Sequence, residues 1–370
     1  MNGFKSKAAI SAAVMVLAGL IACGASAGAD EMTGPITLTD EGSFFVGGDI
    51  VHTDAVSGDP KGPAGIGYAN DDDLKFNQMY VQYQVPEGAA DAVPIVLVHG
   101  CCLSAAEWED TPDGRMGWAE YFLRNHHAMY LPDQTSRGRS GFNATVINEV
   151  RLGKKPPSEL PDIYTLGRTA AWDLFRFGPK YPDVWPGEQF PIDALGTFAS
   201  QVIPDLNTTS PQPDPTYKNL AELGKMAGGA VIVGHSESAF FPVEAALDDN
   251  AGVKGLIVIE GFCRELKPEE VAKLTKIPTL IIFGDHLDGS DVSKKIWPAA
   301  LSTCETFAKQ VNDAGGKVQL VKLPDIGCQG NSHMLMQDKN SLDIAAWVEK
   351  WLRDDVVQTH EVPTVGKVRG

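Results

Sequence analysis

The sequence predicts an α/β fold in which helices flank a mostly parallel central sheet. Short, wholly apolar runs recur along the chain, as expected for buried parallel strands, and segments of helical length separate them. Strands that alternate with helices in this way define the α/β class. The predicted strands are residues 43–47, 79–85, 94–98, 128–132, 230–233, 255–259, 279–283 and 318–323.

Helical patterns in the intervening segments support this fold. Residues 117–125 have helical character, and residues 341–353 place their apolar side chains on one face. The alternation breaks at residues 143–228, which are rich in proline and aromatic residues and contain no clear strand. We predict that these residues form a cap or lid inserted into an α/β core of residues 28–142 and 229–370. An ordered surface excursion with its own small core is the alternative.

The composition excludes several functional classes. The 370 residues are 43% hydrophobic and 21% charged, which is enough apolar material for a large core and argues against disorder. Because 31 basic residues face 48 acidic ones, the formal net charge is −17. Nucleic acids and anionic membranes are bound through basic patches, so we expect neither as a partner.

The N-terminus has the features of an export signal. Lys5 and Lys7 precede an apolar run at residues 8–22, which is shorter than a membrane span of about 20 residues. A small-x-small pattern at residues 25–27 then matches a signal peptidase site. We therefore expect residues 1–27 to be a signal peptide, and the mature chain to be periplasmic or extracellular with no integral membrane span.

The expected export affects how the cysteines are interpreted. The sequence L-I-A-C at residues 20–23 resembles a lipobox, so a lipid anchor through Cys23 is an alternative fate of the N-terminus. Outside the cytoplasm disulfides are allowed. No C-x-x-C pair and no histidine–cysteine cluster at metal spacing occurs, so we predict no metal site. The other cysteines are Cys101, Cys102, Cys263, Cys304 and Cys328.

Residues 234–238 carry the strongest chemical signal. They read G-H-S-E-S and lie between a predicted buried strand and a predicted helix. This is the arrangement of a nucleophile elbow, in which a strained turn exposes the serine hydroxyl at the edge of the sheet. Ser236 is therefore the candidate nucleophile. Ser238 stands where such elbows usually have a second glycine, which is a mild departure.

A serine nucleophile needs a base and an acid. His333 lies in a turn-rich loop between the last predicted strand and the last predicted helix, where the histidine of an α/β hydrolase is found. Three acids keep the order serine, acid, histidine. Glu260 ends the strand at residues 255–259, whereas Asp285 and Asp288 follow the next strand. The residues alone leave this choice open.

The oxyanion hole requires backbone N–H donors beside the nucleophile. We expect one from Glu237 and the other from the H-G-C-C loop at residues 99–102, through Cys101 or Cys102. In an oxidising compartment these adjacent cysteines could form a strained disulfide that makes the loop rigid. Two small buried thiols are the alternative.

These motifs together resemble a small group of secreted bacterial α/β-hydrolase esterases with adjacent active-site cysteines. The resemblance rests on H-G-C-C, T-P-D-G-R-M-G-W-A-E-Y-F from Thr111, D-Q-x-x-R-G-R-S from Asp133, G-H-S-x-S, V-I-E-G and the late S-H. It implies Ser236 as nucleophile, His333 as base and Glu260 as acid, ahead of Asp288 and Asp285.

The resemblance also has implications for the cysteines and the partners. It implies a Cys101–Cys102 disulfide at the oxyanion hole and a Cys304–Cys328 disulfide that braces the loop of His333, which leaves Cys263 unpaired. It implies no organic cofactor and no metal, and it suggests a homodimer.

The expected activity is hydrolysis of small-molecule carboxylic esters by a secreted serine hydrolase, through an acyl-enzyme intermediate and a Ser-His-Glu triad. A lactonase or an amidase would use the same triad. A catalytically inactive hydrolase fold that binds a ligand is the alternative from a different functional class.

Overall fold

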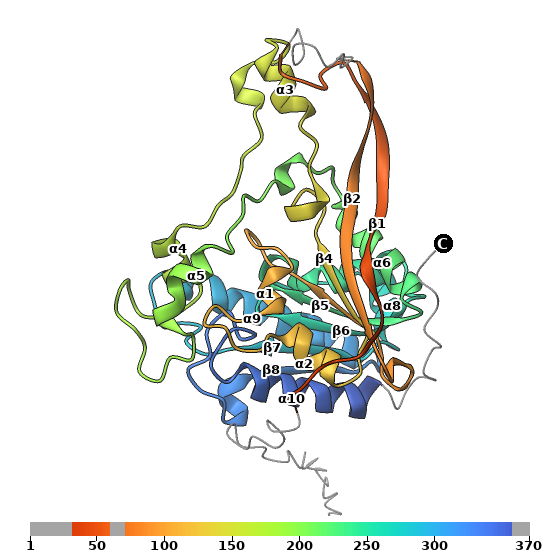
Figure 1. Cartoon of the computed structure of the whole chain (residues 1–370). Helices are drawn as coiled ribbons and strands as arrows, with labels where there is room; N and C mark the ends of the chain where they lie inside the picture. The colour runs from red at the N-terminus through yellow and green to blue at the C-terminus, as the bar shows by residue number, and fades with distance from the viewer. Residues whose placement is uncertain (1–31, 60–70, 357–370) are drawn as a thin grey trace, which may run out of the picture.

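The computed structural model describes residues 32–59 and 71–356 (Figure 1). The predicted signal peptide at residues 1–27, including Cys23, lies outside the described residues. The described part forms one mixed sheet of eight strands in the order β1-β2-β4-β3-β5-β6-β7-β8. Only β2 runs antiparallel to its neighbours β1 and β4, and the pairs from β4 to β8 are parallel. The predicted α/β fold with a mostly parallel sheet is confirmed.

The strands are β1 (Leu38–Thr53), β2 (Asp72–Pro86), β3 (Ile95–Val98), β4 (Met129–Asp133), β5 (Ala230–His235), β6 (Val253–Ile259), β7 (Thr279–Phe283) and β8 (Val318–Lys322). The α-helices are α1 (Ala106–Glu109), α2 (Trp118–Arg124), α3 (Thr145–Arg151), α4 (Arg168–Leu174), α5 (Leu195–Ala199), α6 (Pro215–Met226), α7 (Phe241–Asp248), α8 (Pro268–Leu274), α9 (Ser293–Asp313) and α10 (Ser341–Trp351).

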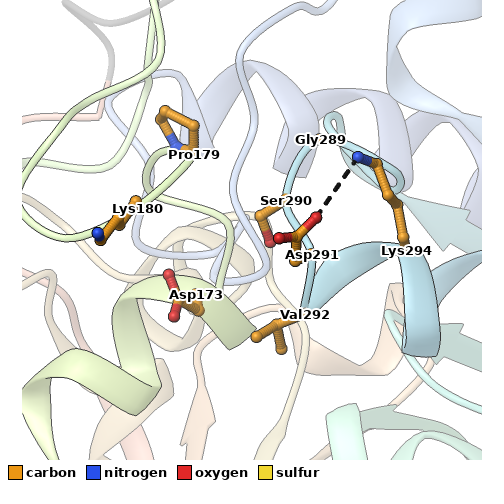
Figure 2. A pocket seen from close by; sticks show the side chains of 8 residues that line it. All are labelled: Asp173, Pro179, Lys180, Gly289, Ser290, Asp291, Val292 and Lys294. Carbon is orange, nitrogen blue, oxygen red and sulfur yellow. Dashed lines mark ion pairs between the residues drawn. The ribbon is translucent and has the colours of Figure 1, made fainter.

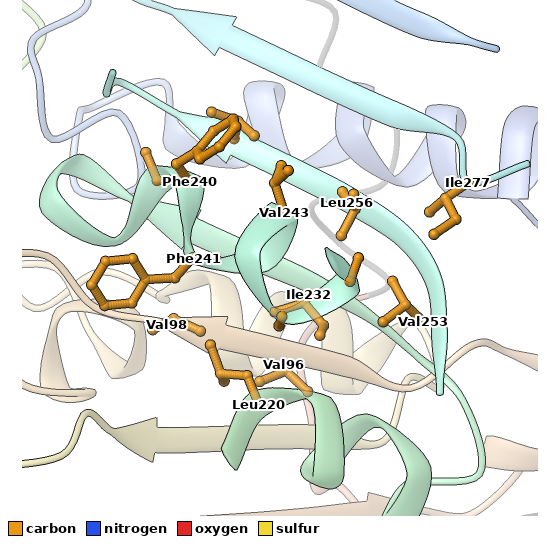
Figure 3. Close-up of a cluster of buried hydrophobic side chains, with 14 of the residues drawn as sticks. Val96, Val98, Leu220, Ile232, Phe240, Phe241, Val243, Val253, Leu256 and Ile277 are labelled. Atoms are coloured by element: carbon orange, nitrogen blue, oxygen red, sulfur yellow. The ribbon is translucent and has the colours of Figure 1, made fainter. Parts of the chain in front are cut away.

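Each central strand is apolar on both sides because both faces of the sheet are covered. Alternate residues of a strand point to opposite faces, so β3 gives Ile95 and Leu97 to one hydrophobic cluster and Val96 and Val98 to the other. Side chains of α6, α7, α8 and α9 join the Val96 face, part of which Figure 3 shows. Side chains of α2 and α10 cover the opposite face. This explains why these strands appear in the sequence as continuous apolar runs.

The first two strands are longer than the apolar runs that predicted them. They form an antiparallel hairpin that extends beyond the sheet towards α3 (Figure 1). Asn148 on α3 donates hydrogen bonds to the carbonyls of Ala55 and Val56 at the far end of this hairpin, each at 3.0 Å. Backbone pairing therefore continues through residues whose side chains are polar or exposed.

The chain between β4 and β5 adds no strand to the sheet. It contains α3, α4, α5 and finally α6, whose buried side chains pack on the sheet within the same cluster as α7. That the stretch of residues 143–228 acts as a cap stays a prediction. Among the described residues, no helix is long and apolar enough to span a membrane.

The predicted Cys304–Cys328 disulfide is wrong, as is an unpaired Cys263. Cys263 and Cys304 form a disulfide with an S–S distance of 2.02 Å. The reason lies in the two faces of the sheet. Cys304 on α9 and Cys263 after β6 belong to one hydrophobic cluster, whereas Cys328 belongs to the cluster on the opposite face. Cys304 therefore ties α9 to the loop after β6.

Removal of this disulfide should destabilise the fold. The bond closes a loop between residues 41 positions apart, and closing such a loop restricts the unfolded chain. We expect replacement of both Cys263 and Cys304 by alanine to lower the free energy of unfolding by about 2–4 kcal/mol in denaturant titrations. Peptide mapping without reductant should recover the Cys263–Cys304 peptide pair. A Cys304–Cys328 pair would contradict the assignment.

Candidate active site

Three sheet elements bring the predicted catalytic side chains together. Ser236 follows β5 and Glu260 follows β6, and these are neighbouring parallel strands. His333 comes from the loop between β8 and α10. The carboxyl ends of parallel strands meet at one edge of the sheet, where ligands of open α/β sheets bind. The site therefore lies where the fold class favours one.

The turn at Ser236 has the strained backbone that the motif predicts. Ser236 has a φ of 59°, a conformation that residues other than glycine rarely adopt. A Cβ atom at Gly234 would overlap the Ser238 carbonyl, so the first small residue is required for the close approach of strand and helix. The Ser238 hydroxyl is buried and lies 3.1 Å from the carbonyl oxygen of Val98. The departure from glycine thus adds a link between the elbow and β3.

A chain of short distances connects the three residues. Nε2 of His333 lies 2.8 Å from Oγ of Ser236, and Nδ1 of His333 lies 3.2 Å from Oε2 of Glu260. Glu260 and His333 are fully buried, whereas Ser236 is partly exposed. Of these three hydrogen-bonded side chains, only that of Ser236 is therefore accessible to a substrate.

The two other candidate acids have different surroundings. The Asp285 carboxylate accepts hydrogen bonds from the backbone N–H groups of His286 at 2.6 Å and Gly330 at 3.0 Å. Asp288 is exposed. Of the three acids, the structure brings Glu260 to His333, and Asp285 instead braces the loop that carries the histidine.

Glu260 is surrounded by donors. Its Oε1 accepts hydrogen bonds from Nη2 of Arg176 at 2.7 Å and from the backbone N–H of Gly284. Burial alone would raise the pKa of Glu260, but the Arg176 charge and the His333 hydrogen bond outweigh it and lower the pKa to about 2. The carboxylate therefore stays ionised over the physiological range.

His333 lies among aromatic rings. Phe175 stacks against it with centroids 4.9 Å apart, and the ring of Trp297 lies 4.6 Å away. Burial lowers the pKa of His333 to about 3, although the hydrogen bond to Glu260 opposes the shift. The imidazole is thus neutral in the resting site, as a general base must be.

Asp338, which follows His333 in the sequence, holds the loop of His333 through hydrogen bonds. Its carboxylate accepts hydrogen bonds from the Ser332 hydroxyl at 2.7 Å, the Ser332 N–H at 2.9 Å and the Asn331 amide at 2.9 Å. Burial raises the pKa of Asp338 to about 6 despite these donors. Asp338 therefore ties together the residues that directly precede His333.

The predicted oxyanion loop lies against Ser236, the candidate nucleophile. A Cβ atom on Gly100 would lie only 2.9 Å from Cβ of Ser236, so the loop touches the elbow. The Cys102 N–H already donates a hydrogen bond to the Asp205 carboxylate at 3.3 Å. Of the two cysteines, Cys101 is therefore the better placed to offer a free N–H group.

The side chain of Glu237, the other expected source of an oxyanion donor, is anchored. Its Oε1 lies 2.5 Å from Nη2 of Arg137 and 3.0 Å from the Asn207 amide. Burial raises the pKa of Glu237, and the Arg137 charge opposes the rise. These contacts hold the first turn after Ser236 in place.

The predicted Cys101–Cys102 disulfide is not formed in the structure. Both residues are thiols, and their Sγ atoms lie 2.7 Å apart, longer than a disulfide bond of about 2.05 Å. The physical reason is that Cα atoms of adjacent residues, about 3.8 Å apart, are closer than an unstrained bridge allows. The hydrogen bond between the thiols and the burial of Cys101 raise its pKa. Bond formation in an oxidising compartment stays a prediction.

One group of side chains in the described part of the chain could offer metal ligands. Ligand atoms of Cys101, Cys102 and Asp205 all lie within 4.8 Å of one another. The Asp205 carboxylate, however, already accepts hydrogen bonds from Arg137 at 3.0 Å and the Asn207 N–H at 2.9 Å. Only the two thiols are then available, which is fewer than the ligands of a structural zinc site.

A surface pocket of about 410 Å³ lies apart from the three residues (Figure 2). Asp173 at the end of α4 and Lys180 face residues 289–292 and Lys294 across it. Lys294 and Asp291 form an ion pair at 3.8 Å within its lining. Neither Ser236 nor His333 lines this pocket, so it is not the site of the predicted chemistry.

Comparison with known proteins gives the class of the chain. No family model matches the sequence. The solved structure of a bacterial esterase is 43% identical, with a TM-score of 0.81, and the match covers 88% of this chain and 98% of that one. A protein from Fungal sp. (strain ATCC 74256), described as a probable secreted lipase, is 25% identical over 317 residues, covering 74% of this chain and 85% of the lipase.

The fold, the elbow and the esterase match define an α/β hydrolase. Within that class the chain belongs to the esterases, the enzymes that hydrolyse carboxylic esters. The predicted resemblance to α/β-hydrolase esterases is confirmed.

Sequence reasoning missed Arg176, which contacts Glu260 from the segment after α4. The residue interrupts an aromatic run, Phe175-Arg176-Phe177, within the predicted cap. A single charge between two buried aromatic side chains was the available signal, because such a charge requires a buried partner. The sequence does not say which of the 48 acidic residues that partner is.

The tight approach of the H-G-C-C loop to the elbow can be tested at Gly100. Gly100→Ala places a Cβ atom against Ser236 and should displace the hydroxyl from His333. We expect kcat/KM for an activated ester to fall about 10²-fold, since small misplacements cost that much. Gly167→Ala is the matched control, because the added Cβ atom meets nothing within 4 Å and φ is −85°. Equal activities of the two variants would contradict the geometry.

Proposed function

We propose that this chain hydrolyses carboxylic esters through an acyl-enzyme intermediate. Ser236 is the nucleophile, His333 takes up and returns the proton, and Glu260 is the carboxylate member of the triad. The observation that carries the proposal is the continuous hydrogen-bond chain from Ser236 through His333 to Glu260, with distances of 2.8 and 3.2 Å. The positive φ of Ser236 and the burial of the other two residues support it.

The reaction follows from the positions of the protons. Nε2 of His333 takes the proton of the Ser236 hydroxyl as its oxygen attacks the ester carbonyl. The imidazolium that forms is stabilised by the Glu260 carboxylate and then gives its proton to the leaving alcohol. A water molecule, activated by the same imidazole, hydrolyses the acyl-enzyme and restores the serine.

The oxyanion of the tetrahedral intermediate needs two N–H donors. We assign one to Glu237, which follows the nucleophile, and the other to Cys101 or Cys102 in the loop that touches Ser236. The contact of Cys102 N–H with Asp205 favours Cys101 of these two. A disulfide between the cysteines would make this loop more rigid.

We also propose that the protein acts outside the cytoplasm. The curated relative is a probable secreted lipase, and the Cys263–Cys304 disulfide suits an oxidising compartment. The signal-like residues at the N-terminus support the same proposal.

The triad is tested by three substitutions. Ser236→Ala and His333→Ala should each lower kcat by about 10⁴-fold or more, because each removes a group that the reaction needs. Glu260→Gln should lower kcat by about 10²–10⁴-fold, since the neutral amide cannot stabilise the imidazolium.

Asp288→Asn is the matched control for Glu260→Gln and should retain nearly full activity, because Asp288 is exposed. A fluorophosphonate should add once to the wild type, and peptide mass spectrometry should locate the adduct on Ser236. Absence of labelling in folded protein would favour a binding protein without catalysis. A larger loss in Asp288→Asn than in Glu260→Gln would assign the acid to the later strand.

The pH profile should extend to acidic values. Burial lowers the pKa of His333 to about 3, so its neutral, basic form persists far below the ordinary value of 6.5. Because the base is inactive only when protonated, the titration of His333 should leave kcat/KM for an uncharged ester nearly constant between pH 5 and pH 7. A change near pH 6 would instead report Asp338, whose pKa burial raises to about 6. An acid limb with its midpoint near 6.5 that persists in Asp338→Asn would show that the imidazole is not desolvated in the working enzyme.

A further inference from the structure

Arg176 reaches the candidate triad from outside the sheet. It follows α4, in the stretch between β4 and β5, and lies 84 positions before Glu260 in the sequence. The side chains of Arg176 and Glu260 are both 0% exposed, so neither charge is in contact with solvent. A buried charge of this kind is tolerated only with a well-placed partner.

Two nitrogen atoms of the guanidinium donate hydrogen bonds, whereas the third, Nη1, is buried and has no hydrogen-bond partner among the described residues. Nη2 donates to Oε1 of Glu260 at 2.7 Å, and Nε donates to the carbonyl oxygen of Asp285 at 2.7 Å. The guanidinium carbon lies 4.9 Å from the centroid of the Trp297 ring, a cation–π contact. Arg176 is thus fixed by three different elements.

The two oxygens of Glu260 are used differently. Arg176 and the Gly284 N–H both bind Oε1, whereas Oε2 faces Nδ1 of His333. A carboxylate held at one oxygen by two donors has little freedom to rotate, so its other oxygen has a fixed direction.

We propose that Arg176 is a positioning residue of the esterase, whose guanidinium holds Oε1 of Glu260 so that Oε2 stays directed at His333. The proposal rests on the triad proposed above and extends it. It also means that the stretch between β4 and β5 supplies residues that hold the triad in place.

Phe175 gives this proposal independent support. Its backbone carbonyl accepts a hydrogen bond from the backbone N–H of His333 at 3.0 Å, and its ring stacks on the imidazole. Two consecutive residues of one segment therefore contact the base and the acid. The φ of 65° at Arg176 is unfavourable for a long side chain and persists only where surrounding contacts over-determine the backbone.

The charge of Arg176 should act on both titrating partners. It favours the ionised form of Glu260 and opposes the protonation of His333. The other titratable groups that face the Arg176, Glu260 and His333 cluster are His235, Asp285, His286, Glu188 and Asp338. Loss of the cation should therefore raise the pKa of both triad partners.

The test compares Arg176→Gln and Arg176→Lys with the wild type in the full exported chain. For Arg176→Gln we expect kcat to fall about 10²-fold with KM nearly unchanged, because Arg176 does not contact the substrate. The acid limb of kcat/KM should move to higher pH by about one unit or more. Arg176→Lys retains the charge, so its acid limb should stay close to that of the wild type although its kcat falls.

Arg264→Gln is the matched control, because Arg264 also forms ion pairs with carboxylates, those of Glu244 and Glu270, which do not belong to the triad. It should leave the pH profile unchanged. Far-UV circular dichroism and thermal unfolding identify any variant that does not fold. If Arg176→Gln fails to fold, the folded Arg176→Lys variant still tests the proposal. A kcat of Arg176→Lys equal to that of the wild type would overturn the positioning role.

Two further outcomes separate this inference from the proposed function. A folded Arg176→Gln enzyme with an unmoved acid limb and an unchanged kcat would overturn the role of Arg176, while labelling of Ser236 by a fluorophosphonate would leave the triad intact. Full activity in Glu260→Gln would instead overturn the triad, and the role of Arg176 with it.

Discussion

The burial of the Glu260 charge is the constraint on which the rest of the site depends. An ionised carboxylate with no exposure to solvent is costly unless donors replace the lost water. Here the donors are His333, Arg176 and the Gly284 N–H, which come from three separate stretches of the chain. The loop after β8, the segment after α4 and the turn after β7 must therefore converge on one point. A disturbance in any of them leaves a buried charge without a partner.

Strand register explains why this carboxylate is the one at the histidine. His235 pairs with Ile259 across β5 and β6, so Ser236 and Glu260 follow at the same level of the sheet. Both residues have positive φ angles, 59° and 55°, and so both side chains leave their strands on sharp turns. Gly261 lets the two turns approach, because a Cβ atom there would overlap the carbonyl of Ser236. Asp285, one strand further, binds the Gly330 N–H instead.

Patterns within a few consecutive residues predicted the central strands and two of the candidate catalytic residues. The apolar runs gave the central strands, and strand-to-turn motifs gave Ser236 and His333, because these signals lie within a few consecutive residues. The choice of acid depends on register between strands, and the residues alone left Glu260, Asp285 and Asp288 equivalent. Arg176 and Glu260 are 84 positions apart, and no local pattern identifies Glu260 as the partner of Arg176. The ends of β1 and β2 were missed because backbone pairing continues where side chains are polar.

The pairing of the cysteines also depends on contacts between residues that are far apart in the sequence. Pairing depends on which face of the sheet each residue occupies, and the sequence does not show that Cys304 and Cys328 lie in opposite clusters. With Cys263 as the partner, the covalent bond lies three residues beyond Glu260 and ties the acid side of the site to α9. Hydrogen bonds of Asp338 to Ser332 and Asn331 hold the loop of His333. The candidate acid Glu260 therefore lies between a nearby covalent bond and a buried cation, and the candidate base His333 lies on a loop that a polar network around Asp338 holds in place.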